Sequence, residues 1–188
     1  MLHAAGAAVR RQQARLQVRG RSGDMAAFES VHPHEGTVGE AGYTDYRYAG
    51  TLTGGRFHIV TVAYYEGDSF WLVSADSARK TEVFAEPHLS PDGRFIVAAS
   101  ASDAHNINGV FIWEATPGGL TERLRHEPQA YALHEFVRWR DDGSIELSRT
   151  SLGDGQHCDR SKLMLSTVRL ARGGNAWRFG AASNWRCQ

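Results

Sequence analysis

From residue 43 onward, apolar and polar positions follow the patterns of β-strands. Short runs rich in Val, Ile, Phe and Trp are either alternating or continuously apolar, and Gly, Asp and Ser cluster between them. Runs of this kind, bounded by turn residues, are typical of strands in antiparallel sheets. The runs without alternation indicate strands that are buried on both faces. Helical periodicity is almost absent, so the pattern predicts an all-β fold.

A turn that ends in glycine recurs three times, at Gly55, Gly93 and Gly143, and a β-branched or aromatic run follows each time. Glycine tolerates the positive φ that tight hairpins require. Further apolar and polar runs complete each unit, at a period of roughly 40 to 50 residues that matches a four-stranded propeller blade. We therefore predict three four-stranded antiparallel propeller-type blades over residues 43–188. Since closed propellers typically have at least four blades, the propeller is expected to be open or incomplete.

One of these units carries a more specific signal, the sequence SPDGRFIVA at residues 90–98. It resembles the strand-turn-strand signature of TolB-like and related WD-type β-propeller repeats, over one blade of about 35 residues. The likeness weakens in the other units, where Leu52-Thr53 and Trp139-Arg140 replace the Ser-Pro pair. With the Tyr-Tyr-Glu-Gly hairpin at 64–67, the whole also resembles small bacterial proteins of unknown function. The resemblance implies a propeller fold and an envelope location, and it brings no known active site.

Residues 1–42 stand apart from the repeats and are predicted to be an irregular or flexible N-terminal segment. The first 23 residues carry five arginines and no acid, and residues 7–18 are compatible with a basic helix. The apolar core of a secretory signal peptide is absent from this stretch. We expect the segment, a second copy of the chain or a partner protein to cover the apolar blade face that an incomplete propeller leaves open.

Charge and hydropathy restrict the classes of partner. Lys and Arg total 21, as do Asp and Glu, so the net charge of zero provides no global attraction to nucleic acid or to an anionic membrane. No stretch approaches the roughly 18 to 20 continuous apolar residues of a membrane-spanning helix. We therefore predict neither a nucleic-acid partner nor a membrane span.

The two cysteines, Cys158 and Cys187, are too few for a disulfide scaffold or a structural zinc site. They are either one bridge, which would fasten the C-terminal tail to an earlier loop, or two unrelated thiols. A bridge requires an oxidising compartment, so it is tied to a periplasmic or secreted location.

Candidate chemistry is confined to the loops that join the second and third strands of each unit. Long polar loops on a rigid sheet are frequent places for binding residues, whereas Asp and Asn there also serve simply to satisfy turn backbone. The oxygen atoms of Asp103, Asn106 and Asn108 in the second loop, or of Asp154 and Asp159 in the third, would suit Ca²⁺. Neither of these two loops has EF-hand spacing, and no other cofactor is predicted. His126, His134 and Glu135, between the second and third units, are interpreted as structural. The candidate binding residues are Asp103, His105, Asn106, Asn108, Asp154, His157 and Asp159.

The sequence lacks the nucleophile elbow, the Walker loop, the His-Glu-x-x-His zinc motif and the Rossmann glycine run. We therefore expect a non-catalytic protein-binding module, acting through an uncovered blade face. One alternative is a periplasmic inhibitor or immunity protein against a cell-wall-degrading toxin. Others are a hydrolase or lyase that uses Asp103, His105 and His157, and a metal-binding or small-molecule sensor.

Overall fold

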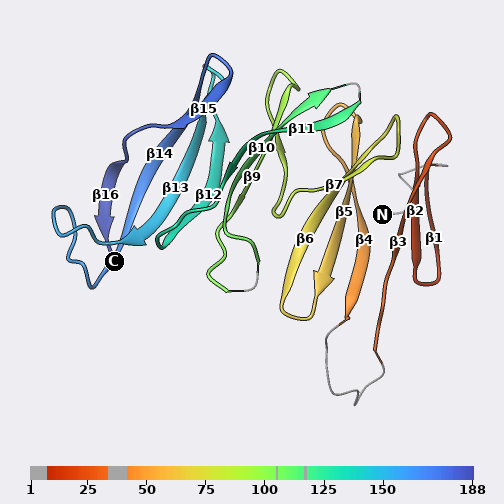
Figure 1. The fold of residues 1–188 in the computed structure, drawn as a ribbon, viewed down its shortest axis with the longest axis horizontal. Coiled ribbons are helices and arrows are strands. Elements are labelled where there is room, and N and C mark those ends of the chain that lie inside the picture. The colour runs from red at the N-terminus through yellow and green to blue at the C-terminus, as the bar shows by residue number, and fades with distance from the viewer. Residues whose placement is uncertain (1–7, 34–41, 105, 117) are drawn as a thin grey trace. The chain divides into compact units, whose positions relative to one another are not determined.

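The computed structural model describes residues 8–33, 42–104, 106–116 and 118–188, and these residues fold as strands, turns and loops (Figure 1). The prediction of an all-β protein with four-stranded antiparallel sheets is confirmed. The chain divides into two compact units. Unit 1 contains residues 1–87 with 116–120, and unit 2 contains residues 88–115 with 121–188.

Unit 1 holds two antiparallel sheets. The first has three strands in the order β1-β2-β3, and the second has four in the order β4-β5-β6-β7. Their bounds are β1 Val9–Gln12, β2 Arg15–Arg19, β3 Met25–Glu29, β4 Thr44–Thr51, β5 Phe57–Tyr64, β6 Gly67–Ser74 and β7 Lys80–Glu82.

Strands β1 to β3 occupy a region that the sequence analysis predicts to be irregular, with a basic helix as an option at 7–18. The physical reason for strands is an alternation of period two, with Leu16 and Val18 buried on β2 and Ala26 and Phe28 buried on β3. The arginines of β2 fall on the opposite, outer face. An Arg-rich composition therefore concealed a sheet with one apolar face.

The buried face of the first sheet packs against β5 and β6. Leu16, Val18 and Phe28 belong to one hydrophobic cluster with Val60 and Val73. This is the arrangement that the sequence analysis offers as one option, in which residues before 43 cover an apolar sheet face. The outer face is polar and basic, as expected for a sheet that ends a stack.

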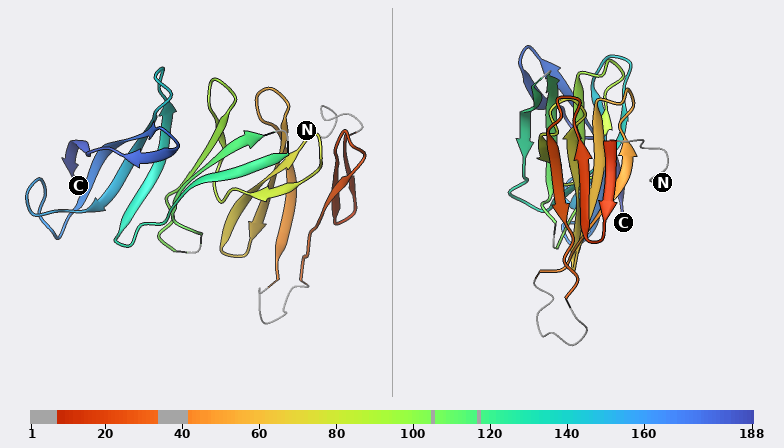
Figure 2. Two further views of the ribbon diagram at one scale, coloured as in Figure 1. Left: turned by 45° about the horizontal axis from the view of Figure 1, so that its top comes forward. Right: turned by 90° about the vertical axis from the view of Figure 1, so that its right-hand side faces the viewer.

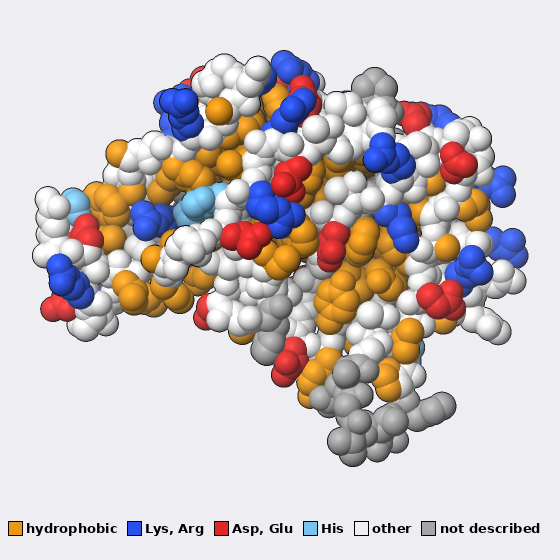
Figure 3. Space-filling model, viewed as in Figure 1, with side chains coloured by type: hydrophobic (Ala, Val, Ile, Leu, Met, Phe, Trp, Pro, Cys, Tyr) orange, Lys and Arg blue, Asp and Glu red, His pale blue; other side chains and the backbone are white. Residues whose placement is uncertain are grey.

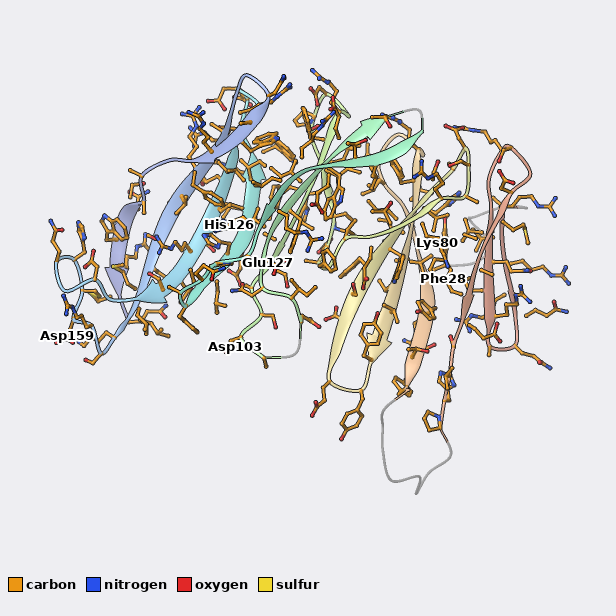
Figure 4. The ribbon with its side chains drawn as sticks, viewed as in Figure 1. Phe28, Lys80, Asp103, His126, Glu127 and Asp159 are labelled. Atoms are coloured by element: carbon orange, nitrogen blue, oxygen red, sulfur yellow. A yellow bond between two sulfur atoms is a disulfide. The ribbon has the colours of Figure 1, made fainter. Side chains whose placement is uncertain are left out.

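Lys80 fastens these two sheets at the edge strand β7. Its Nζ donates to the carbonyl of Ala27 at 3.1 Å and lies 4.8 Å from the ring centroid of Phe28 and 5.8 Å from that of Trp71. Figure 4 shows Lys80 and Phe28 beside each other.

Unit 2 also holds two antiparallel sheets, which Figure 2 shows from two further directions. The first has the order β11-β10-β9-β8, and the second has β12-β13-β14-β15 with β16 also paired to β14. The bounds are β8 His88–Leu89, β9 Phe95–Ser100, β10 Gly109–Thr116, β11 Gly119–His126, β12 Ala132–Trp139, β13 Ile145–Leu152, β14 Leu163–Gly173, β15 Ala176–Phe179 and β16 Ser183–Cys187.

The predicted three units of four strands thus differ in count from the described chain, which has four sheets. The sheet β1–β3 is additional, and the last sheet has a fifth strand because β15 and β16 pair with successive parts of β14. Strands β15 and β16 therefore lie one after the other along the same edge of β14, and residues 180–182 separate them.

The three turn glycines do occupy corresponding positions, each just before the second strand of its sheet. The φ angles of Gly55, Gly93 and Gly143 are 66°, 70° and 74°, and each amide donates to the carbonyl three residues earlier at 2.9 Å. Only glycine adopts this left-handed conformation without steric cost, so the repeat of turns in the sequence is a repeat of geometry.

The core of unit 2 lies between its two sheets. Ile145, Leu147 and Leu170 from the last sheet pack with Val97 and Ile112 from the other. The opposite face of the last sheet is mixed. Its polar residues include Glu146, Ser148, Thr150, Thr167 and Arg169, and toward the loop-bearing ends of β13 and β14 the same face carries the exposed Leu152 and Leu163.

Candidate functional site

The strands of unit 2 have two distinct ends, here called the turn end and the loop end. The turn end, at the top of unit 2 in Figure 1, holds the turns at 90–93 and 140–143 and the hairpin at 173–175. The loop end holds the loops 101–108 and 153–162 and the link 127–131. The predicted binding residues all belong to the loop end.

Three cavities of unit 2 lie at the turn end. One has a volume of about 380 Å³ and is bounded by Pro91, Phe95, Trp139, Arg172 and Trp177. Two smaller hollows share parts of the same walls. Figure 3 shows hydrophobic side chains flanked by basic and acidic ones at this end. We call this depression the turn-end groove.

Aromatic rings form one wall of the groove. Phe95 and Trp177 meet edge to face with ring centroids 5.4 Å apart, and Trp139 lies 6.2 Å from Trp177. Phe95 and Trp177 are 6 % and 7 % exposed, and the indole N–H of Trp139 donates to the carbonyl of His88 at 3.2 Å. Packing and this hydrogen bond hold the rings in place, so the wall is preorganised.

Guanidinium groups surround the rings, and most of them are engaged. Arg94 and Arg123 both bind Glu114, at 3.1 and 2.7 Å, and the hydrogen bonds, that from Arg123 first, lower the pKa of that carboxyl. Arg140 binds Glu146 at 2.7 Å in the same way. These exposed pairs orient the side chains more than they stabilise the fold.

Arg172 differs from its neighbours. Its guanidinium lies 5.1 Å from the ring centroid of Phe95, and it is the register partner of Trp177 across the β14–β15 hairpin. Within residues 8–33, 42–104, 106–116 and 118–188, no ion pair to Arg172 is found at 4.0 Å or less. Arg172 is therefore an exposed cation stacked on the aromatic wall and free to bind an anion.

The turn aspartates have a structural task. Asp92 accepts from the Ser90 hydroxyl at 2.6 Å and from the Arg94 amide at 3.0 Å, and the Ser90 bond lowers its pKa. Asp142 accepts from Ser144 in the same manner and pairs with Arg169. Both carboxylates close their own turns, which is the usual use of Asp at these positions.

At the loop end, the predicted residues of the 153–162 loop also bind their own loop. Asp154 accepts from the amides of Gln156 and His157 at 2.8 and 2.7 Å, and its second oxygen meets His157 Nδ1 at 2.7 Å. Asp159 accepts from the amide and hydroxyl of Ser161, and these bonds lower its pKa. The backbone-satisfying interpretation left open by the sequence describes both carboxylates.

A disulfide joins Cys158 to Cys187, with Cα atoms 5.7 Å apart. It fastens β16 to the 153–162 loop, and the ring of His157 stacks on Trp185 of that strand at 4.6 Å. Of the two options for the cysteines, the structure contains the bridge.

The other predicted loop contributes little to a site. The backbone N–H of Asn106 donates to the hydroxyl of Ser102, and Asn108 donates its side-chain NH₂ to the carbonyl of Ala132 at 2.9 Å. Asp103 lies apart from Asp159 in Figure 4, on a different loop. His105 lies outside the described residues. Those predicted residues that the structure describes therefore do not converge on one point.

Beneath these loops lies a pair of histidines that the sequence analysis interprets as structural. The rings of His126 and His134 are 5.8 Å apart, and both contact Phe179. His134 is 3 % exposed, and burial, with the nearby His126 and Arg149, lowers its pKa to about 4. Its Nδ1, Asn108 Oδ1 and Ser151 Oγ are buried without a hydrogen-bond partner, so this region suits internal water.

In comparisons with known proteins, no family model, curated protein or solved structure matches the chain. In the part of the chain that the structure describes, no group of three or more His, Cys, Asp or Glu side chains is placed to hold a metal ion. Nor do the described residues include a helix long and apolar enough to cross a bilayer.

The groove residues were missed by sequence reasoning, which placed every candidate binding residue in the long loops at the other end of the strands. A signal was present in the stretch Arg172-Gly173-Gly174-Asn175-Ala176-Trp177, because a tight hairpin at the glycines places Arg172 opposite Trp177. What no local pattern contained was the approach of Phe95 from another sheet.

Proposed function

We propose that this chain is a non-catalytic protein-interaction module built on propeller-type sheets, and that the turn-end groove of unit 2 is its binding surface. The turn-end groove carries the proposal, since it combines preorganised Trp139 and Trp177 with the free cation Arg172. Aromatic and Arg side chains are the residue types enriched at the energetic centres of protein interfaces.

The polar outer face of the sheet β1–β3 supports the choice of the groove over that blade face. A blade face that bound a partner or a second copy by burial would carry an apolar patch. The disulfide supports an oxidising compartment, such as the periplasm or the exterior, as the place where the module works.

The test is site-specific photo-crosslinking in the native cell. A photoreactive residue at Asn175, on the groove rim, is compared with one at the exposed Arg178, whose side chain points to the opposite side of β15. We expect a specific protein adduct from position 175 and not from 178. The identified protein, once purified, must then bind the intact chain saturably. Equal labelling from both positions, or no saturable binding, contradicts the proposal.

A further inference from the structure

We infer that the turn-end groove binds an extended acidic peptide segment, in which a glutamate or aspartate lies beside a proline or another apolar residue. This inference rests on the proposed function and adds the chemistry of the partner. It follows from the guanidinium of Arg172, which has no carboxylate partner in the described part of the chain, and from the aromatic wall beside it.

The first step is the charge around Phe95 and Trp177. Arg94, Arg123 and Arg172 approach this region, and Glu114 binds the first two. Asp92 is held by Ser90 and by the amide of residue 94. Both acids around Phe95 and Trp177 therefore already have partners. Of the three guanidinium groups, only that of Arg172 has no carboxylate partner among the described residues. A carboxylate from outside would complete the set.

The second step concerns the other end of the groove, which is lined by two arginines followed by two aspartates, Arg138, Arg140, Asp141 and Asp142. Arg138 and Arg140 share Glu146, and Asp142 pairs with Arg169. This lobe is balanced and does not favour a ligand of either charge. The anion-selective position is thus at Arg172, and the rest of the groove contributes shape.

The third step is the apolar requirement. Phe95 and Trp177 are largely buried, so the part-exposed Trp139 supplies the aromatic surface that a ligand bound to Arg172 can contact. Proline and other compact apolar side chains pack on aromatic walls, and an extended proline-containing peptide loses little conformational entropy on binding. Arg172 is suited to the neighbouring carboxylate because a guanidinium stacked on a ring retains its planar donors for two parallel hydrogen bonds.

The experiment uses the intact chain and a capped repeat peptide of alternating proline and glutamate, followed through the indole N–H resonances of the tryptophans. We expect saturable shifts of the Trp139 and Trp177 signals, and an unshifted Trp71 signal. A matched proline–glutamine peptide should bind about tenfold more weakly, and free glutarate should fail to shift Trp139. If glutarate binds as well as the peptide, the groove is a site for a small carboxylate and the inference is overturned.

Two variants complete the test. Arg172→Gln should weaken binding of the glutamate peptide about tenfold and bring it to the level of the glutamine peptide, whereas Arg178→Gln should leave the affinity unchanged. Equal binding of the two peptides to the native chain, or no saturable shift up to about 5 mM peptide, overturns the inference. If a crosslinked partner is found but Arg172→Gln binds it normally, the acidic-peptide inference fails while the interaction module stands. Absence of any partner refutes the proposed function itself.

Discussion

Aspartates close their own turn or loop at both ends of unit 2, whereas the groove lies at the turn end. At the loop end, residues that look chemically promising are occupied by their own backbone: Asp154 and Asp159 close the loop in which they occur. At the turn end, short hairpins from two sheets converge, and their side chains meet residues that are distant in sequence. Long polar loops in this unit supply their own stability, and the surface available to a ligand arises where tight turns come together.

The largest difference between the two ends is expected when Trp177, whose ring joins the groove to the core, is removed. Trp177→Ala should destabilise unit 2 by about 3–5 kcal/mol, because Trp177 is 7 % exposed and contacts both Phe95 and Trp139. Trp185→Ala, at the loop end, should cost only about 1 kcal/mol, since its main partner is the exposed His157. Urea unfolding measures both. Equal losses would mean that the groove wall is not part of the core.

The loop end has its own structural device in the disulfide. Replacing Cys158 and Cys187 together with serine should lower the free energy of unfolding by about 3 kcal/mol, because the bridge closes a loop of 29 residues in the unfolded chain. The Trp139 and Trp177 indole resonances should remain in place, since the bridge does not reach the turn end. Loss of those resonances would show that the two ends are not independent.

How far the sequence predicts this molecule depends on how local the determining contacts are. The glycine turns and the all-β fold were predictable, because Gly93 and Gly143 and the strands after them act within a few residues. The first sheet was not predicted because the Arg-rich composition of this segment was given more weight than the alternation of buried and exposed residues in β2. The groove was not predictable, because Phe95 and Trp177 are far apart in the chain and no pattern in either segment encodes their meeting.

A pH titration separates the ends further. His134 has a folded pKa of about 4 against an ordinary 6.5, so the unfolded chain binds a proton that the folded chain excludes. Its contribution is complete above pH 6.5 and is lost as the pH falls from 6.5 through 4, about 3 kcal/mol in total. Urea unfolding between pH 7 and 4.5, where most carboxylates remain ionised, measures it. His134→Phe should remove most of this slope, and an unchanged slope would show that His134 titrates normally.

The smallest effect we predict concerns the turns that form the groove rim. Gly93→Ala should cost about 1–2 kcal/mol, because alanine at a φ of 70° brings its Cβ too close to the backbone carbonyl. Gly143→Ala, at 74°, should cost the same, since the two turns share one geometry. Gly173→Ala is the control on the third hairpin: its φ is not in the left-handed region, and an added Cβ meets no atom within 4 Å. Thermal unfolding of the three variants decides the matter. If alanine is tolerated equally at all three positions, turn conformation does not restrict these sites, and the repeated glycine loses its meaning as the marker of equivalent strands.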